Sequence, residues 1–261
     1  MPQHEVLYLV PTWILGVVLL VACIAASELG YRVGRARRIA GAVDDSLTTV
    51  EAAMLGLLAL LIAFTYSIAS TRYETRKQFV LDETTAISAA IVQAGLDPSP
   101  HAAQVASILR EYVDVRLEFF FAGADMSRID RAEREANRLV AEAWATVKRM
   151  TTESPPTDLT QTLVQSLSDV MSLNTKRLAA MRDHVPEPMI FLMMLVSVAA
   201  FGLVGNSIGN KGRRSFWTSF SIPLIVVACI ALTIDLDRPR RGIVNVSQKP
   251  LLDLKESLQA R

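Results

Sequence analysis

Two sets of residues in this chain have the types and spacing to act on ions. The first is an apolar row at intervals of four, three and four residues inside a hydrophobic segment, namely Leu57, Leu61, Phe64 and Ile68. Such intervals place side chains on one face of a helix. If this helix lines a pore, the row is an apolar constriction that gates the pore by dewetting. Periodicity alone favours packing of the row against helices or lipid, and the pore stays the alternative interpretation.

The second set is charged and lies where hydrophobic segments end. Arg72 and Arg76 follow one segment, and Asp235, Asp237 and Arg238 follow another. A charge at the centre of a bilayer costs about 2.5–3.5 kcal/mol on insertion scales, so we expect these groups at the membrane interface. We interpret the aspartates as partners of the two arginines that hold the two segments together. The alternative is an ion-selecting ring made by the same charges in an oligomer.

Residues with enzymatic chemistry are scarce. His4, His101 and His184 are far apart in sequence, and none has a partner at metal-binding spacing. The sequence also contains no glycine-rich phosphate loop and no nucleophile motif. We therefore predict that the protein is not an enzyme and uses no metal or cofactor. A net charge of +1 argues against nucleic-acid binding, which usually depends on a basic patch.

Four hydrophobic segments position these residues. The chain has 261 residues, of which 51% are hydrophobic, and the excess is concentrated in residues 7–29, 51–70, 189–208 and 216–234. Each segment is long enough to cross the hydrocarbon core as a helix. Elsewhere apolar residues recur at three and four and strand signals are nearly absent, so we predict an all-α protein. Residues 20–23 resemble a lipoprotein cleavage box, but no Lys or Arg precedes them, which favours a retained membrane helix.

The second hydrophobic segment continues into a polar region without a helix breaker. No proline occurs from Glu51 to Asp97, so we predict one continuous helix over 51–94 that leaves the membrane. Turn residues then separate three further predicted helices, over 101–121, 128–150 and 157–184. Ser127 and Asp130 resemble a capping box at the start of the second of these three.

The predicted organisation is four transmembrane helices with a long extramembrane helical domain inserted between spans two and three. Its parts are membrane helices in 1–70, the helical domain over 71–186, membrane helices in 187–236 and a tail over 237–261, with a short amphipathic helix at 251–258. A predicted polar loop over 30–50 carries Arg32, Arg35, Arg37 and Arg38, which act as a topology signal or bind anionic head groups. The first span favours an outside N-terminus and the total of positive residues favours the reverse, so the orientation stays open.

Two smaller patterns bear on helix packing. The helix over 157–184 carries a stripe at intervals of three and four: Leu163, Leu167, Val170, Asn174, Leu178 and Met181. Its one polar member, Asn174, fixes register or oligomeric state, or is a satisfied core amide. In the third span, Gly202, Gly205 and Gly209 permit close approach of another helix, within the chain or in an oligomer.

Stretches at both ends of the predicted domain resemble a known family. Residues 59–67 and 72–76, followed by Asp82 and Glu83, resemble the opening motif of the bestrophin-like domain proteins, which are bacterial and plastid membrane proteins. Residues 234–239, with Gly242 and then 246–248, resemble the family signature after the last span. Asn174, Arg177 and Arg182 ahead of Pro186 fit its middle part. The resemblance covers most of the chain from Glu51 to Leu258.

This resemblance implies kinship with bestrophins, which are pentameric ion channels whose second transmembrane helix lines the pore. It predicts a multi-pass protein of the bacterial inner membrane that forms a homo-oligomer in the lipid bilayer and conducts inorganic ions. Leu57, Leu61, Phe64 and Ile68 would then line the constriction. The alternative is a non-conducting membrane scaffold or sensor whose helical domain binds a partner.

Overall fold

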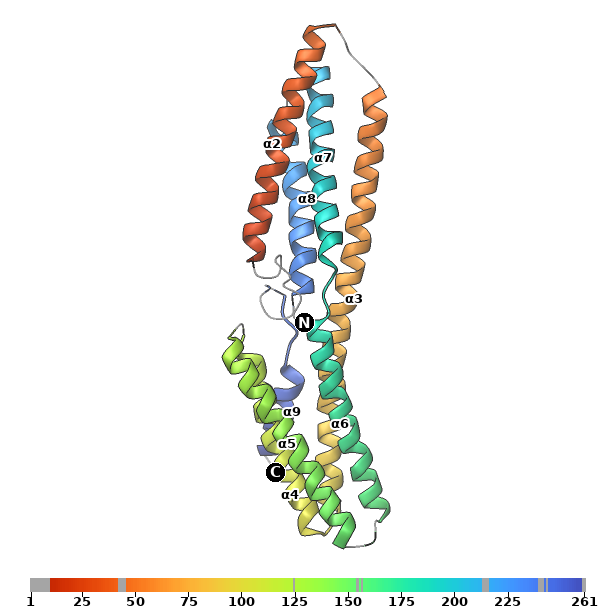
Figure 1. Cartoon of the computed structure of the whole chain (residues 1–261), viewed down its shortest axis with the longest axis vertical. Coiled ribbons are helices and arrows are strands. Elements are labelled where there is room, and N and C mark those ends of the chain that lie inside the picture. Colours follow the sequence, from red (N-terminus) through yellow and green to blue (C-terminus); the bar gives the residue numbers. More distant parts are fainter. Residues whose placement is uncertain are drawn as a thin grey trace. The chain divides into compact units, whose positions relative to one another are not determined.

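The computed structural model describes residues 10–41, 46–123, 125–153, 155, 157–212, 216–238, 242 and 244–259. Every regular element in these ranges is a helix, which confirms the predicted all-α class for them (Figure 1). The helices are α2 (Thr12–Ile39), α3 (Ser46–Leu96), α4 (Pro100–Phe121), α5 (Met126–Glu153), α6 (Asp158–Arg182), α7 (Glu187–Lys211), α8 (Phe216–Asp237) and α9 (Lys249–Gln259). Four described stretches are long and apolar enough to cross a membrane, namely Thr12–Ile39, Thr48–Leu96, Asp158–Lys211 and Phe220–Asp237. His4 and Leu7, where the first span was predicted to begin, lie outside the described residues.

α3 is one continuous helix of 51 residues, as the absence of proline predicts. At 1.5 Å per residue it is roughly 77 Å long. It ends at Leu96 because Pro98 disfavours helical backbone at the residue before it. Ser99 then caps α4 by accepting a hydrogen bond from the backbone N–H of Ala102 at 3.1 Å. Proline and the cap residue together explain this corner.

The polar loop predicted over 30–50 is wrong, because α2 continues as a helix to Ile39. Glu28 supports the extension by pairing with Arg32 one turn later, at 3.2 Å between Oε1 and Nε. Arg37 and Arg38 occupy the last turn, where positive charge is favourable beside the helix C-terminus. The chain then turns at Gly41, whose φ of 71° favours glycine. The arginines therefore belong to a helix end and not to a loop.

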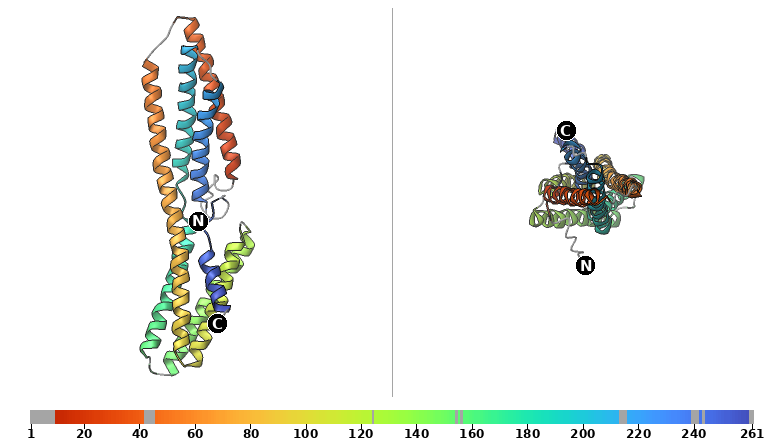
Figure 2. Two further views of the ribbon diagram at one scale, coloured as in Figure 1. Left: turned by 180° about the vertical axis from the view of Figure 1, so that it is seen from behind. Right: turned by 90° about the horizontal axis from the view of Figure 1, so that it is seen from above.

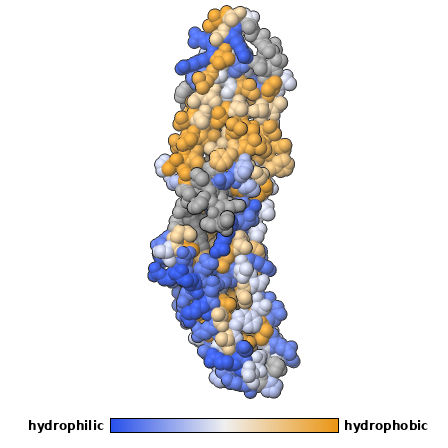
Figure 3. All heavy atoms as spheres, in the orientation of Figure 1, coloured by the Kyte–Doolittle hydropathy of each residue, from blue (hydrophilic) through white to orange (hydrophobic). Residues whose placement is uncertain are grey.

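The described chain forms two compact units. Unit 1 holds the described residues of 1–72, 184–238 and 242–244, and unit 2 holds those of 73–183 and 245–259. In unit 1, α2 lies beside α7 and α8 (Figure 1, Figure 2). Its core includes Leu58, Met193, Phe201 and Ile230. On the face drawn in Figure 3, apolar side chains gather over the helices of this unit, and such a surface suits contact with lipid.

The contact of α2 with α7 depends on glycine. A Cβ atom on Gly205 of α7 would collide with the backbone of Ser27, and a Cβ atom on Gly30 of α2 would collide with the backbone of Gly202. The other glycines blocked in this way are Gly34 and Gly209. The two backbones therefore touch, as is typical of membrane helices that pack through small residues. The predicted close packing is confirmed for Gly205 and Gly209, whereas a Cβ atom on Gly202 would make only an ordinary contact with Ala26.

Unit 2 combines the last part of α3 with α4, α5, α6 and α9. α4 packs against α5 and α9, and α5 packs against α6. The core contains buried side chains from every one of these helices, among them Ile87, Leu109, Leu139, Leu163 and Leu251. The predicted stripe of α6 faces this core, with its first four members buried and Leu178 and Met181 partly buried. The amphipathic helix predicted at 251–258 is α9, with Leu251 and Leu254 buried.

Local caps set the starts of α5 and α6. α5 begins at Met126, before the predicted Arg128, because Asp125 Oδ1 accepts from the backbone N–H groups of Ser127 and Arg128 at 3.0 and 3.2 Å. The predicted cap by Ser127 and Asp130 is therefore wrong at this helix start. α6 begins at Asp158 as predicted, and Thr157 and Thr160 cap it reciprocally.

Candidate functional site

The apolar row of α3 lies partly on the surface of the chain. Leu57 and Phe64 are 45% and 59% exposed, whereas Leu61 and Ile68 are partly buried against the core of unit 1. The α3 side chains that bury most fully in this stretch are Leu58, Thr65 and Ala69. The row therefore lies along the border between the packed face and the exposed face of the helix. That position suits contact with lipid, with a second copy of the chain or with a water-filled pore.

Asp235 and Asp237, at the end of α8, are buried and bind backbone N–H groups of unit 1. Asp237 Oδ2 accepts from the backbone N–H of Val185 at 2.8 Å, and His184 Nδ1 lies 3.8 Å from the same oxygen. Asp235 Oδ2 accepts from the backbone N–H of Val244 at 3.0 Å. Asp237 thus ties the end of α8 to the segment before α7, and Asp235 ties it to the turn that follows.

The arginines of the predicted charge cluster lie in both units, with Arg72 and Arg238 in unit 1 and Arg76 in unit 2. Arg76 donates from Nε to the carbonyl of Ala180 at 3.0 Å and from Nη2 to that of Asp183 at 2.7 Å. These carbonyls lie at the C-terminal end of α6, where a cation is favourable. The pairing of Asp235 and Asp237 with the arginines stays a prediction.

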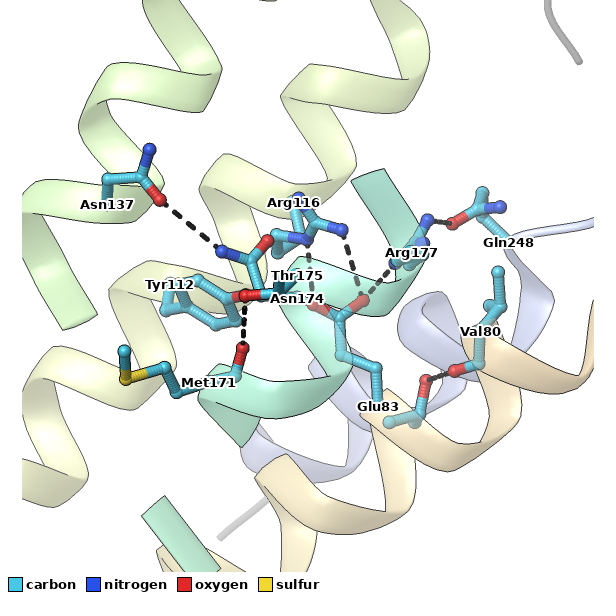
Figure 4. Close-up of polar contacts among 11 residues, drawn as sticks. Val80, Glu83, Tyr112, Arg116, Asn137, Met171, Asn174, Thr175, Arg177 and Gln248 are labelled. Carbon is cyan, nitrogen blue, oxygen red and sulfur yellow. Dashed lines mark hydrogen bonds and ion pairs between the residues drawn. The ribbon is translucent and has the colours of Figure 1, made fainter. Parts of the chain in front are cut away.

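Unit 2 contains a second polar site, a buried cluster around Glu83 (Figure 4). Glu83 comes from α3, Tyr112 and Arg116 from α4, Arg177 from α6 and Gln248 from the segment before α9. Glu83 is 0% exposed, and Tyr112, Arg116 and Arg177 are each 1% exposed. The cluster thus joins three helices of unit 2 and the segment before a fourth through fully buried polar groups.

Each oxygen of the Glu83 carboxylate has two partners. Oε1 accepts from the Tyr112 hydroxyl at 2.8 Å and lies 2.9 Å from Arg116 Nε. Oε2 accepts from Arg116 Nη2 at 3.3 Å and from Arg177 Nη1. Arg177 Nη2 then donates to Gln248 Oε1 at 2.6 Å. The arrangement satisfies the carboxylate fully, as a charge buried in a protein requires.

The electrostatics of this cluster favour its charged state. Burial by itself raises the pKa of Glu83, but the charges of Arg116 and Arg177, with hydrogen bonds from Arg177 and Tyr112, hold it below its ordinary value. Burial also lowers the pKa of Arg177, and the Glu83 charge opposes this. Burial and the Glu83 charge both raise the pKa of Tyr112, whose hydroxyl therefore stays a donor. One carboxylate faces two guanidinium groups, so the cluster is positively charged.

The sequence contains a signal for this cluster in the apolar neighbours of its charged residues. Glu83 lies on a helix face with Val80 and Ile87, and Arg116 lies on a face with Tyr112 and Phe119; all four neighbours are buried. A charge among such apolar positions requires a partner in the core. Glu83 and Arg177 are named in the sequence analysis only as parts of family motifs. A single sequence does not indicate which helix supplies the partner of a buried charge.

The two histidines in the described part of the chain do not gather into a site. His101 Nε2 lies 2.7 Å from Glu153 Oε2 and joins the start of α4 to the end of α5, while His184 neighbours Asp237. Within the described part of the chain, no group of three His, Cys, Asp or Glu side chains could hold a metal ion.

A family model decides the kinship of the chain. The model of the bestrophin-like domain matches residues 16–251, which is most of the sequence. The chain belongs to the bestrophin-like family. The match includes α2 and therefore begins well before Glu51, where we had placed the start of the resemblance. No curated protein matches the chain.

Solved structures of bestrophin homologues share the fold. A bacterial bestrophin homologue from Klebsiella pneumoniae, phased with zinc, has a TM-score of 0.65 at 15% identity, over 92% of this chain and 98% of that one. A point variant of a homologue from the same organism has a TM-score of 0.70 at 13% identity, over 94% of this chain and 98% of that one. A further match, described only as a membrane protein, has a TM-score of 0.71 at 12% identity, over 94% and 96% of the two chains. At these identities the likeness extends to the fold alone.

Proposed function

We propose that this protein forms a homo-oligomeric ion channel in the bacterial inner membrane, with the stretch of α3 from Leu57 to Ile68 lining the pore. The observation that carries the proposal is the exposed apolar face of α3 in a bestrophin-like chain. On that face Leu57, Leu60 and Phe64 are 45%, 52% and 59% exposed. An apolar ring of such side chains would close a pore by dewetting. Inorganic ions and the lipid bilayer are then the partners of the protein.

A second row on α3 supports oligomer formation. Ala52, Gly56, Ala59, Ala63 and Ser67 recur at intervals of four, three, four and four residues, and all five are exposed in the single chain. Small residues in a membrane helix let another helix approach closely. In a ring of subunits this row would meet the next copy, and the adjoining Leu57 and Phe64 would face the axis.

The same proposal places residues 71–186 outside the membrane and assigns the membrane helices to 1–70 and 187–236. The surface of α5 supports this assignment. Arg138 lies 2.6 Å from Glu135 and 2.7 Å from Glu142, and all three side chains are exposed. A solvent-exposed network of charges suits water and would be costly in lipid.

The test is the conductance of purified protein in planar bilayers under a salt gradient. Phe64→Ala and Leu57→Ala are expected to raise the unit conductance several-fold, because a smaller side chain weakens the dewetting barrier. Leu195→Ala, at a position 67% exposed on α7, is the matched control and is expected to leave the conductance unchanged. The sign of the reversal potential distinguishes cations from anions. Silence of all variants, in protein that is folded and oligomeric, would instead favour a non-conducting scaffold.

A further inference from the structure

Unit 2 contains a cavity beside the Glu83 cluster that the channel proposal does not use. Its volume is about 240 Å³, and its walls come from α3, the end of α4, α6 and the segment before α9. The residues that decide its chemistry are Arg76, Phe119, Phe120, Arg177, Met181 and Asn245. Because all of them belong to unit 2, the cavity lies within one compact unit.

The charged part of the wall is positive. Arg76 and Arg177 are 4% and 1% exposed, and no Asp or Glu side chain is among the described residues that line the cavity. Glu83 lies behind Arg177 and is shared with Arg116, so one carboxylate is divided between two guanidinium groups. Glu133 also acts on Arg116, but from the partly exposed side of the unit. A buried surplus of positive charge favours an anionic guest.

The rest of the wall is largely apolar. Phe119 and Phe120 at the end of α4 and Met181 on α6 line the cavity, and Asn245 is a polar residue of the wall. A ligand without an apolar part would leave this wall in contact with water, so the complex would not gain the free energy of burying the apolar surface. An engineered cavity of about 150 Å³ in another protein admits benzene, so this cavity has room for roughly ten non-hydrogen atoms. A bare inorganic ion would fill only a small part of it.

We propose that this cavity binds a small monocarboxylate with an aliphatic or aromatic body, its carboxylate paired with the arginines and its body against Phe119, Phe120 and Met181. Such a ligand places its negative charge beside the arginines and buries its apolar part. Two sources share this chemistry: a soluble short-chain carboxylate, which the cavity would hold whole, and a fatty acid drawn from the bilayer, whose longer tail would extend out of the cavity.

The experiment is a calorimetric titration of the full-length protein in lipid nanodiscs, with octanoate as the probe. Octanoate is expected to bind saturably at one site per chain and to raise the temperature of unfolding. Octan-1-ol, which lacks the charge, and acetate, which lacks the body, are each expected to bind at least tenfold more weakly. Palmitate distinguishes the sources, because octanoate binding without palmitate binding assigns a soluble carboxylate. Tighter binding of palmitate than of octanoate assigns a membrane fatty acid, and both results support the site.

Variants then locate the site. Met181→Trp fills the cavity and is expected to abolish octanoate binding, whereas Met171→Trp, at a position 48% exposed on the same helix, is expected to preserve it. Asn245→Asp adds a negative charge at the cavity from an exposed position, and it is expected to weaken octanoate at least tenfold without changing the binding of octan-1-ol. If Met181→Trp fails to fold, Asn245→Asp decides the question by itself.

Equal binding of octanoate and octan-1-ol, or unchanged octanoate binding in Asn245→Asp, would overturn the proposal. Because the readout is binding and not current, the result does not depend on whether the protein conducts ions.

Discussion

Units 1 and 2 hold their helices together in opposite ways. In unit 1, α2 and α7 meet through glycines, so that the two backbones touch. In unit 2, α3, α4 and α6 meet around a buried carboxylate and two arginines inside an apolar core. If unit 1 lies in lipid as we propose, apolar side chains gain little by meeting one another, and close backbone contact becomes the main attraction. Unit 2 is instead stabilised by the hydrophobic effect, which offsets the free-energy cost of removing the charge cluster from water.

The largest expected effect comes from neutralising the centre of the cluster in unit 2. Glu83→Gln keeps the size of the side chain but removes the carboxylate that faces the buried charges of Arg116 and Arg177. Removing one member of a buried ion pair typically costs about 3–5 kcal/mol, so we expect a loss of that order in the free energy of unfolding. Thermal and denaturant unfolding of the purified protein in nanodiscs measures it.

The matched control for this substitution is Glu74→Gln on the same helix. Glu74 is 62% exposed and pairs with Lys77 at 3.5 Å, so its loss is expected to change stability by less than about 1 kcal/mol. Equal stability of the two variants would show that the Glu83 cluster is not what holds the core of unit 2.

The pH dependence of stability follows from the lowered pKa of Glu83. Because this pKa is lower in the folded than in the unfolded state, the unfolded chain binds more protons at acidic pH, and stability falls as pH falls. The Glu83 contribution is complete above the unfolded pKa, near 4.3, and is lost as the pH drops toward the folded pKa. We therefore expect the stability difference between wild type and Glu83→Gln to be constant from about pH 8 to pH 5 and to shrink below about pH 4.

Urea unfolding across this pH range measures the difference. Other carboxylates also titrate there, so only the difference between the two proteins reports on Glu83. A difference that changed between pH 8 and pH 6 would contradict this account of the cluster.

In unit 1 the corresponding test is one added methyl group. Gly205→Ala places a Cβ atom against the backbone of Ser27, which cannot move like the end of a flexible side chain, so we expect a loss of about 1–3 kcal/mol from overpacking. Gly202→Ala is the control, because its Cβ atom would lie 3.8 Å from the nearest atom, the Ala26 carbonyl oxygen. Alanine is the better helix former by roughly 0.5–1 kcal/mol, so Gly202→Ala is expected to be neutral or stabilising.

The readout is again thermal unfolding in nanodiscs. A Gly205→Ala variant as stable as Gly202→Ala would mean that α2 can shift away from α7 at little cost. Close backbone contact would then not be what holds the helices of unit 1 together.

The sequence predicted the helices better than the contacts between them. The continuity of α3 followed from the absence of proline, because that effect acts within a few residues. Its end was predicted two residues early, at 94, whereas the helix continues to Leu96, close to Pro98. The loop predicted over 30–50 failed because charged residues near a helix C-terminus are favourable and do not end the helix. Gly205 and Gly209 were recognised as packing residues, but the helix that they meet, α2, could not be identified from spacing.

The candidate sites were predicted less completely. The row from Leu57 to Ile68 was predicted as one face, whereas the structure gives its members two environments, because the packed face of α3 runs through Leu58, Thr65 and Ala69. The Glu83 cluster needs partners on α4 and α6, and a single sequence carries no information on which distant helices meet. The cavity beside it depends on Phe119 and Phe120, which periodicity alone describes only as core residues.

The smallest effect is expected at the predicted pairing of Asp237 with Arg72 in unit 1. Asp237 accepts from the backbone N–H of Val185, and the carbonyl oxygen of Asn can still accept that hydrogen bond, so Asp237→Asn removes only the charge. If the carboxylate also pairs with Arg72, a cycle of Asp237→Asn, Arg72→Gln and the double variant is expected to give a coupling energy of about 1 kcal/mol.

Glu28 and Arg32, an exposed pair on α2, provide the reference cycle, with an expected coupling of about 0.3–0.5 kcal/mol. A coupling at Asp237 and Arg72 within about 0.3 kcal/mol of zero would mean that the charge of Asp237 gains nothing from Arg72, and its established contact would remain the backbone before α7. In that case the helices of unit 1 would be held by contacts with the backbone, both at the glycines and at Asp237. Unit 2 would differ in that its helices meet around a cluster of paired charges.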